Sequence, residues 1–228
     1  MRASVKTAAI AAFAAISTFA VERATAVPPT PAATVGQAAP AFSAPDVAGK
    51  AVRLADYAGN TIVLEWTNDG CPFVGKHYDS GNMQALQRRY TAAGVVWLTV
   101  ASSAPGEQGY VTPPEAKADL ARWQAAPTDF LLDPDGVVGR LYDARATPNM
   151  VIIDRNGRVV YMGAIDDKPS TRLADVKTAH NYVAAALDAV AAGQPVAVAS
   201  TRAYGPHGNG DLRRVSLRLF RGSGSTWY

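Results

Sequence analysis

The stretch Leu64-Glu65-Trp66-Thr67-Asn68-Asp69-Gly70-Cys71-Pro72-Phe73-Val74 decides the fold, because a buried strand changes there into a turn and then a helix. Residues 61–67 are nearly all β-favouring, as expected of a central strand covered on both faces. A turn at residues 68–70 follows, and the helical pattern begins after it. Cys71 therefore lies at the end of a strand and the start of a helix, where α/β proteins place ligands and reactive groups.

Outward from this stretch, strand and helix patterns alternate along the chain. In order, we expect a hairpin-like region at 50–57, a helix capped by Ser80 and ending at Gly94, a strand at 94–100, a helix from Thr112 to about Gln124, a strand at 130–132, a turn at 133–136, a hairpin of 150–154 with 158–162, and a helix over 175–191. This β-α-β-α-β then β-β-α order predicts one α/β domain with a mixed sheet flanked by helices.

The N-terminus has the layout of a secretory signal peptide. Arg2 and Lys6 precede an apolar run over residues 8–21, and Ala24-Thr25-Ala26 offers a cleavage point, so we expect residues 1–26 to be removed. The alternative is a membrane anchor, but this run is too short to cross about 30 Å of hydrocarbon at about 1.5 Å per residue. The sequence thus predicts a periplasmic or secreted protein, with no membrane association after signal removal.

Charge excludes nucleic acid as an expected partner. The whole chain carries a net charge of +3. Segments 1–26 and 206–228 carry +2 and +3, which leaves −2 for residues 27–205, so the domain itself is not basic. Composition divides the rest into a flexible Pro/Ala-rich leader at 27–40, a folded domain at 41–195 and a C-terminal tail at 196–228 that we expect to be disordered.

Cys71 is the only cysteine of the 228 residues, so no internal disulfide can form. The side chain is then an inert buried group, a free reactive thiol, or half of a bond to another molecule. A position in a turn between Gly70 and Pro72, at a helix N-terminus, favours the thiolate and therefore a reactive thiol.

The segment Leu64–Val74 resembles the active-site segment of the thioredoxin superfamily, most closely its peroxiredoxin-like (redoxin) branch. Residues 35–42 and 49–59 are similar to the redoxin entry segment, and Thr147-Pro148 matches the cis-proline position beside the reactive sulfur. The resemblance covers about residues 35–195. It implies a thioredoxin-like fold with Cys71, Glu65, Thr147 and Pro148 as the catalytic residues.

The sequence departs from both parent patterns of that superfamily. Thioredoxins carry Cys-x-x-Cys, whereas Val74 occupies the fourth position here. Peroxiredoxins carry Pro-x-x-x-Thr/Ser-x-x-Cys, and those two upstream places hold Leu64 and Asn68. Relatives that end after Tyr-Gly-Cys have a second thiol there, whereas this chain continues as Tyr204-Gly205-Pro206.

Three further side chains have two interpretations each. Glu65 matches the buried acid that relays protons in thioredoxins, since burial of a carboxyl group suits proton transfer; alternatively it points to a solvated edge or pairs with Lys76. Lys76 and His77 follow Cys71 on its helix and either stabilise the thiolate or, as we expect, occupy a solvated face. Three histidines and one cysteine, widely spaced, predict no metal site, and no cofactor is expected.

Together these features predict an exported thiol oxidoreductase of the antioxidant class, acting on peroxides or disulfides. Its partners would be a peroxide substrate and an external thiol reductant or a disulfide-bearing protein. The alternative is a non-catalytic thioredoxin-fold binding module that has lost the second cysteine.

Overall fold

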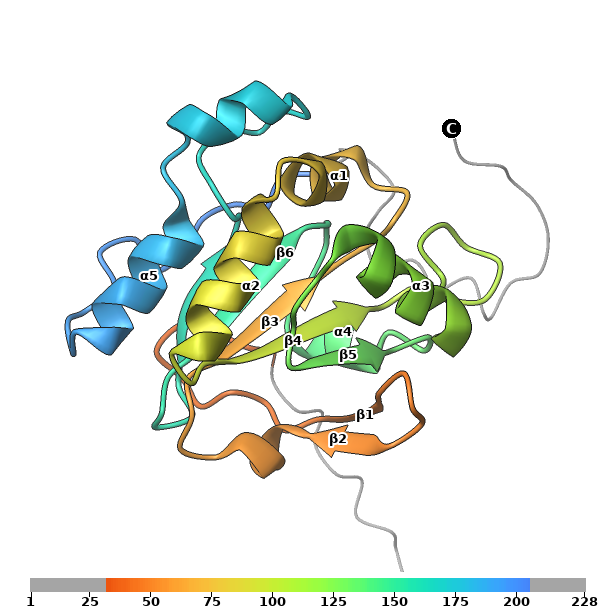
Figure 1. The fold of residues 1–228 in the computed structure, drawn as a ribbon. Helices are drawn as coiled ribbons and strands as arrows, with labels where there is room; N and C mark the ends of the chain where they lie inside the picture. The colour runs from red at the N-terminus through yellow and green to blue at the C-terminus, as the bar shows by residue number, and fades with distance from the viewer. Residues whose placement is uncertain (1–31, 206–228) are drawn as a thin grey trace, which may run out of the picture.

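The structure, a computed structural model, describes residues 32–205 (Figure 1). The expected signal peptide at 1–26 and residues 206–228 of the expected tail lie outside the described residues. At the centre is a five-stranded sheet of order β5-β4-β3-β6-β7. Its strands are β3 (Ile62–Trp66), β4 (Val96–Ala101), β5 (Asp129–Leu132), β6 (Asn149–Ile153) and β7 (Val159–Gly163).

The sheet is mixed, as the sequence predicts. β3 pairs in parallel with β4, and β4 with β5, whereas β6 is antiparallel to both β3 and β7. Every residue of β3, β4 and β6 is buried, in keeping with their mostly apolar sequences. The parallel pairs are joined by helical crossovers, and the β6–β7 hairpin completes a thioredoxin-like fold.

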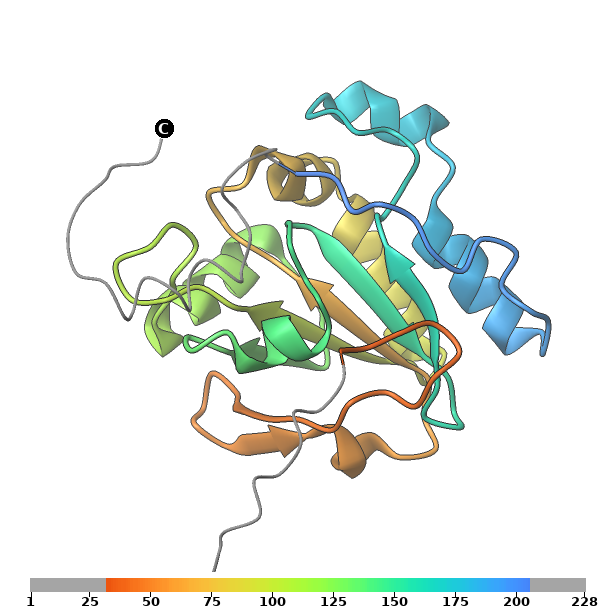
Figure 2. The ribbon, with the colours of Figure 1, turned by 180° about the vertical axis from the view of Figure 1, so that it is seen from behind.

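Helices cover one face of the sheet, and a small second sheet with a short helix covers the other (Figures 1 and 2). The helices of the first face are α1 (Pro72–Asp79), α2 (Asn82–Ala92), α3 (Pro113–Trp123) and α5 (Tyr182–Ala191). The opposite face carries β1 (Ser43–Pro45), β2 (Ala51–Arg53), the 3-10 helix η1 (Leu54–Tyr57) and α4 (Val137–Leu141). Alternate residues of β3 therefore face two different cores: Val63 packs on the α2 side, and Leu64 on the α4 side.

Two expected helices have different boundaries in the structure. Ser80 does not cap the second helix; it ends α1, and α2 begins after Gly81, whose φ of +76° is a conformation that glycine adopts readily. The single helix expected over 175–191 is divided into the 3-10 helix η2 (Leu173–Thr178) and α5. The division falls at Asn181, whose side chain accepts a hydrogen bond from Ala184 N at 2.8 Å and so starts a new helix.

The expectation of a flexible leader at residues 27–40 is wrong for residues 32–40, the part that the structure describes. Ala33 is buried and donates a backbone hydrogen bond to Leu141 O at 2.7 Å. Gly36 N donates to Val159 O at 2.7 Å, and Val159 N donates to Gln37 O at 2.9 Å. This segment is held because its backbone groups pair with the start of β7, a partner that Pro/Ala-rich composition does not show.

The expected disorder of residues 196–228 is also wrong for the part described. Residues 199–205, which we name the C-terminal strap, run back from α5 along β7 towards α1 (Figure 2). Met162 N donates to Ala199 O at 3.1 Å, and Thr201 N donates to Met162 O at 3.0 Å. The strap ends in two buried residues, Tyr204 and Gly205.

Candidate functional site

Cys71 is the N-cap residue of α1 and follows the turn that leaves β3, as the sequence predicts. Its N–H donates to Asn68 O at 3.0 Å, which closes the turn, and its carbonyl oxygen accepts from Gly75 N at 2.9 Å, which begins the helix. Pro72 occupies the first helical position, where a missing N–H costs no hydrogen bond. The thiol therefore lies beside the unpaired N–H groups of a helix N-terminus.

The loop between α4 and β6 brings Thr147 and Pro148 to this thiol. Cys71 Sγ donates a hydrogen bond to Thr147 O at 3.1 Å, across 76 positions of sequence. The Thr147–Pro148 peptide bond is cis, in agreement with the position that the resemblance implies. Cys71 itself is 4% exposed, so the sulfur is covered in this structure.

Glu65 is fully buried, so it does not point to a solvated edge, and its hydrogen-bond partners do not include Lys76. Its carboxylate accepts hydrogen bonds from four side chains. These are Tyr78 OH at 2.7 Å, Trp97 Nε1 at 2.7 Å, Gln87 Nε2 at 3.0 Å and Thr99 Oγ1 at 3.2 Å. Burial raises the pKa of Glu65 above its usual 4.5, and these hydrogen bonds oppose that shift.

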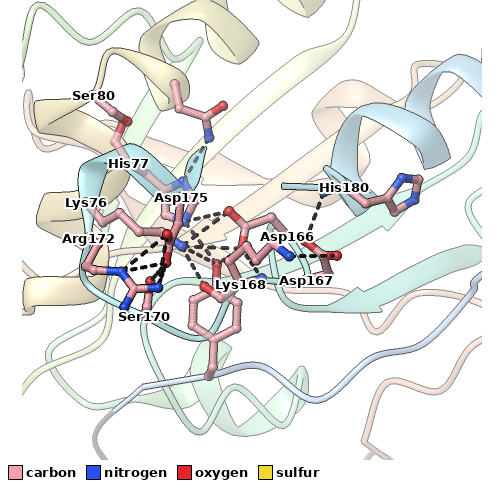
Figure 3. Close-up of polar contacts among 12 residues, drawn as sticks. Lys76, His77, Ser80, Asp166, Asp167, Lys168, Ser170, Arg172, Asp175 and His180 are labelled. Atoms are coloured by element: carbon pink, nitrogen blue, oxygen red, sulfur yellow. Dashed lines mark hydrogen bonds and ion pairs between the residues drawn. The ribbon is translucent and has the colours of Figure 1, made fainter. Parts of the chain in front are cut away.

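Lys76 and His77 do not lie on a solvated face, and that expectation is wrong. Both side chains are fully buried on α1 and point towards Asp166, in the segment after β7 (Figure 3). Lys76 Nζ lies 3.3 Å from each oxygen of the Asp166 carboxylate, and it also donates to Lys168 O at 2.7 Å. A buried ion pair of this kind needs such additional hydrogen bonds to offset the loss of water.

Tyr204 of the C-terminal strap completes this buried cluster. Asn82 Nδ2 donates to Nδ1 of His77 at 2.8 Å, so Nε2 carries the proton and donates to Tyr204 OH at 3.1 Å. Lys76 Nζ also donates to this hydroxyl, at 3.2 Å, and the hydroxyl donates to Asp166. The Tyr204 hydroxyl thus uses its one proton and both of its lone pairs in hydrogen bonds, which fixes the position of this side chain.

Electrostatics within the cluster keep His77 neutral and Tyr204 protonated. Burial, with the nearby Lys76 charge, lowers the pKa of His77 from 6.5 to about 4, although Asp166 opposes the shift. Burial and the hydrogen bond to Asp166 raise the pKa of Tyr204. The cluster therefore has a single buried ion pair, Lys76 with Asp166, surrounded by neutral groups.

Asp166 and Tyr204 are the residues of this region that sequence reasoning missed. They lie 90 and 128 positions from Lys76, so no local spacing links them. Within residues 32–205, no three His, Cys, Asp or Glu side chains are grouped as a metal site requires. No helix in the same range is long and apolar enough to cross a bilayer.

The fold defines a thioredoxin-like protein, with Cys71 at the start of the helix that follows a central strand and in contact with the cis-proline loop. More particularly, the model of the AhpC/TSA family matches residues 35–162, more than half of the chain, and the protein belongs to that family.

Two solved structures are similar over most of their length. An uncharacterized conserved protein from Geobacillus kaustophilus is 27% identical, with a TM-score of 0.62, over 75% of this chain and 87% of that one. A hypothetical protein from Sinorhizobium meliloti 1021 is 24% identical, with a TM-score of 0.63, over 75% of this chain and 92% of that one. No curated protein matches the sequence. Neither structure carries a named activity, so both support the fold.

Proposed function

We propose that this protein is a thiol-dependent oxidoreductase in which Cys71 reacts with a peroxide or a disulfide. The observation that carries the proposal is the position of the sulfur at the N-terminus of α1, 3.1 Å from Thr147 O and beside Pro148. The thiolate is the nucleophilic form of a cysteine, so the thiol first releases the proton that it donates to Thr147 O. Membership of the AhpC/TSA family, a family of antioxidant redoxins, supports thiol redox chemistry as the class of reaction.

With a peroxide, the thiolate attacks one oxygen, the O–O bond breaks, and the other oxygen leaves as an alcohol or water after taking a proton. Cysteine is thereby oxidised to sulfenic acid, and the peroxide is reduced. With a disulfide, the thiolate attacks one sulfur, forms a mixed disulfide and releases the other sulfur as a thiol. Thr147 O accepts a hydrogen bond from the thiol before reaction, and this hydrogen bond is broken when the thiolate forms; Pro148 lies in the loop that positions that oxygen.

Completion of either cycle needs thiols from another molecule, because the chain has one cysteine. A first external thiol condenses with the sulfenic acid, which releases water and forms a mixed disulfide. A second external thiol then attacks that disulfide and restores Cys71, so two reductant thiols leave as one disulfide. After reaction with a disulfide the mixed disulfide is already formed, and one external thiol restores Cys71. The proposed partner is therefore a small-molecule or protein thiol.

Glu65 is proposed as the proton donor and acceptor for these steps. Because its pKa is raised by burial, the carboxyl group gains and loses its proton closer to neutral pH than an exposed glutamate does, as a proton relay requires. Its hydrogen bond with Tyr78 connects it to α1, the helix that Cys71 begins.

The second candidate function is a binding module in which Cys71 is inert. The 4% exposure of Cys71 and its packing with the apolar side chains beneath α1 favour this candidate.

One experiment separates the two candidates. The reduced protein is mixed with hydrogen peroxide or with glutathione disulfide, and its mass is followed over time. Addition of one oxygen, or of one glutathione, to the wild type and not to Cys71→Ser supports the enzyme and identifies its oxidant. No mass change with either reagent, with the protein still folded, supports the binding module.

We also propose that the protein is exported, on the basis of the charged start, the apolar run and the small residues at 24–26. Expression of the full chain with N-terminal sequencing of the mature product tests this. A start at residue 27 in the periplasm or medium is expected, and an unprocessed cytoplasmic product contradicts it.

A further inference from the structure

The C-terminal strap, residues 199–205, is fitted closely to β7. Thr201 Oγ1 accepts a hydrogen bond from Ala164 N at 2.9 Å and lies 2.7 Å from Tyr161 OH. A Cβ on Gly163 would lie 2.3 Å from Thr201 O, so only glycine permits this approach of the two backbones. The same glycine has a φ of +142°, which other residues rarely adopt. The sequence of β7 therefore accommodates the strap.

Tyr204 attaches the strap to the helix that carries the thiol. Its hydroxyl is saturated by Lys76, His77 and Asp166, and the first two of these lie on α1. Its ring lies 5.8 Å from the ring of Phe73 and beneath the Lys76 ammonium, 5.0 Å from the ring centre. Phe73 is two residues beyond Cys71, so the strap reaches the first turn of α1.

Gly205 places the end of the strap against the acceptor of the thiol. A Cβ at Gly205 would lie 3.2 Å from Thr147 O and 3.1 Å from Ala146 Cβ. Thr147 O is also the oxygen that accepts the Cys71 Sγ hydrogen bond. The strap thus contacts two neighbours of Cys71: Phe73 through Tyr204, and Thr147 through Gly205.

We propose that Tyr204 is a specificity-determining positioning residue, which holds the strap across Cys71 and limits the size of the molecules that reach the sulfur. The proposal rests on the thiol reactivity assigned to Cys71 above. Because Cys71 is 4% exposed, a bulky partner reaches it only after a neighbouring segment moves. Up to Thr201 the strap is bonded to β7, and beyond Thr201 its anchoring side chain is Tyr204, so detaching residues 202–205 removes no part of the central sheet.

The test measures access to Cys71 with two reagents of the same chemistry and different size. Full-length wild type, Tyr204→Ala and Tyr204→Phe are alkylated with N-ethylmaleimide and with a fluorescein maleimide, and the ratio of the two rate constants is compared. Tyr90→Phe is the matched control, since it removes another buried tyrosine hydroxyl, one that bonds Ala184 O and Asp188 instead.

We expect Tyr204→Ala to raise the rate with the large reagent about tenfold more than the rate with the small one, from the loss of the hydroxyl contacts and the ring packing. Tyr204→Phe keeps the ring and should give a smaller increase in the ratio. This variant tests the proposal even if Tyr204→Ala does not fold. Tyr90→Phe should leave the ratio unchanged.

A merely structural role would change stability while leaving the ratio of the two rates constant, and this result would overturn the proposal. Absence of alkylation in all folded variants would also overturn it, since release of the strap would then open no route to the thiol. Alkylation needs only a thiol, so inertness towards peroxide and disulfide would refute the proposed function without deciding this question.

Discussion

His77 shows how one residue links the buried cluster to pH. In the folded protein its pKa is about 4, against 6.5 for an ordinary histidine, because burial and Lys76 disfavour the imidazolium ion. Between these two values the unfolded chain binds a proton that the folded chain does not. Its contribution to stability is therefore fully present above pH 6.5 and is lost as the pH falls towards 4. That difference corresponds to about 3 kcal/mol.

His77→Gln should remove this pH dependence, because the amide does not titrate and can still donate a hydrogen bond to Tyr204. The free energy of unfolding in urea is measured from above pH 6.5 down to about pH 4 for both proteins. We expect the wild type to lose about 3 kcal/mol more than the variant over that range. His180→Gln is the control, since His180 is exposed and lies outside the cluster. Equal slopes for His77→Gln and wild type would contradict the assignment.

Glu65 should act on stability with the opposite sign. Its pKa is raised above 4.5 in the folded protein, so its contribution is fully present below pH 4.5 and is lost as the pH rises through the raised value. Glu65→Gln remains neutral, and its stability relative to wild type should therefore increase as the pH rises above 4.5.

Glu115→Gln tests that sign. The exposed Glu115 accepts hydrogen bonds from Thr112, which lower its pKa, so the same substitution there should show no relative gain with rising pH. Urea unfolding of the three proteins against pH measures both effects. A constant difference between wild type and Glu65→Gln would show that Glu65 does not titrate over the range.

For the proposed proton relay, the rate of Cys71 oxidation in Glu65→Gln should lose part of its pH dependence.

At the scale of the element, helix α1 is attached to the rest of the domain by a buried charge, the ammonium group of Lys76. Lys76 distributes its three N–H groups over Asp166, Lys168 O and Tyr204 OH, so it joins α1 to two segments from the C-terminal part of the chain. Its removal leaves the Asp166 carboxylate buried and uncompensated. We expect Lys76→Met to destabilise the protein by about 3–5 kcal/mol.

Lys168→Met is the matched control for this substitution. Its side chain is 40% exposed and its ion pair with Asp167 is 3.8 Å long, so the expected change is within about 0.5 kcal/mol. Chemical denaturation of both variants measures the difference. Similar effects of the two substitutions would show that the buried pair contributes no more than a surface pair.

The strands and most helices could be predicted from the sequence because their signals are local. Thr112 and Glu115 form the capping box that begins α3, and the run from Ile62 to Trp66 is buried throughout. The division between η2 and α5 was missed because the apolar spacing continues through it. Asn181 is a helix-capping residue type in that gap, and it was the available signal.

For the candidate site, sequence reasoning brought together Cys71, Thr147 and Pro148 through a family resemblance rather than through any local pattern. The burial of Lys76 and His77 could not be predicted in the same way. A lysine on a short helix is ordinarily solvated, and only the distant Asp166 and Tyr204 make the buried position stable.

At the scale of the whole molecule, segments from both ends of the described chain complete the domain. Residues 36–39 pair with the start of β7 and the turn before it, and the C-terminal strap pairs with the end of β7 and then reaches α1. The backbone bonds of these two end segments cover part of the outer edge of β7, which reduces the risk of edge-to-edge association. The folded unit therefore extends beyond the 41–195 range that composition suggested, to at least residues 33–205.

Two truncations test that boundary. Removal of residues 206–228 should leave the melting temperature within about 2 °C of wild type, since that sequence lacks a periodic apolar face. Removal of residues 199–228 also deletes Thr201 and Tyr204, with the buried hydroxyl contacts to Lys76, His77 and Asp166. A loss of about 3 kcal/mol from these contacts should lower the melting temperature by about 6–12 °C in a domain of this size. Thermal unfolding followed by circular dichroism measures both changes, and equal melting temperatures for the two truncations would show that the strap does not belong to the cooperative folding unit.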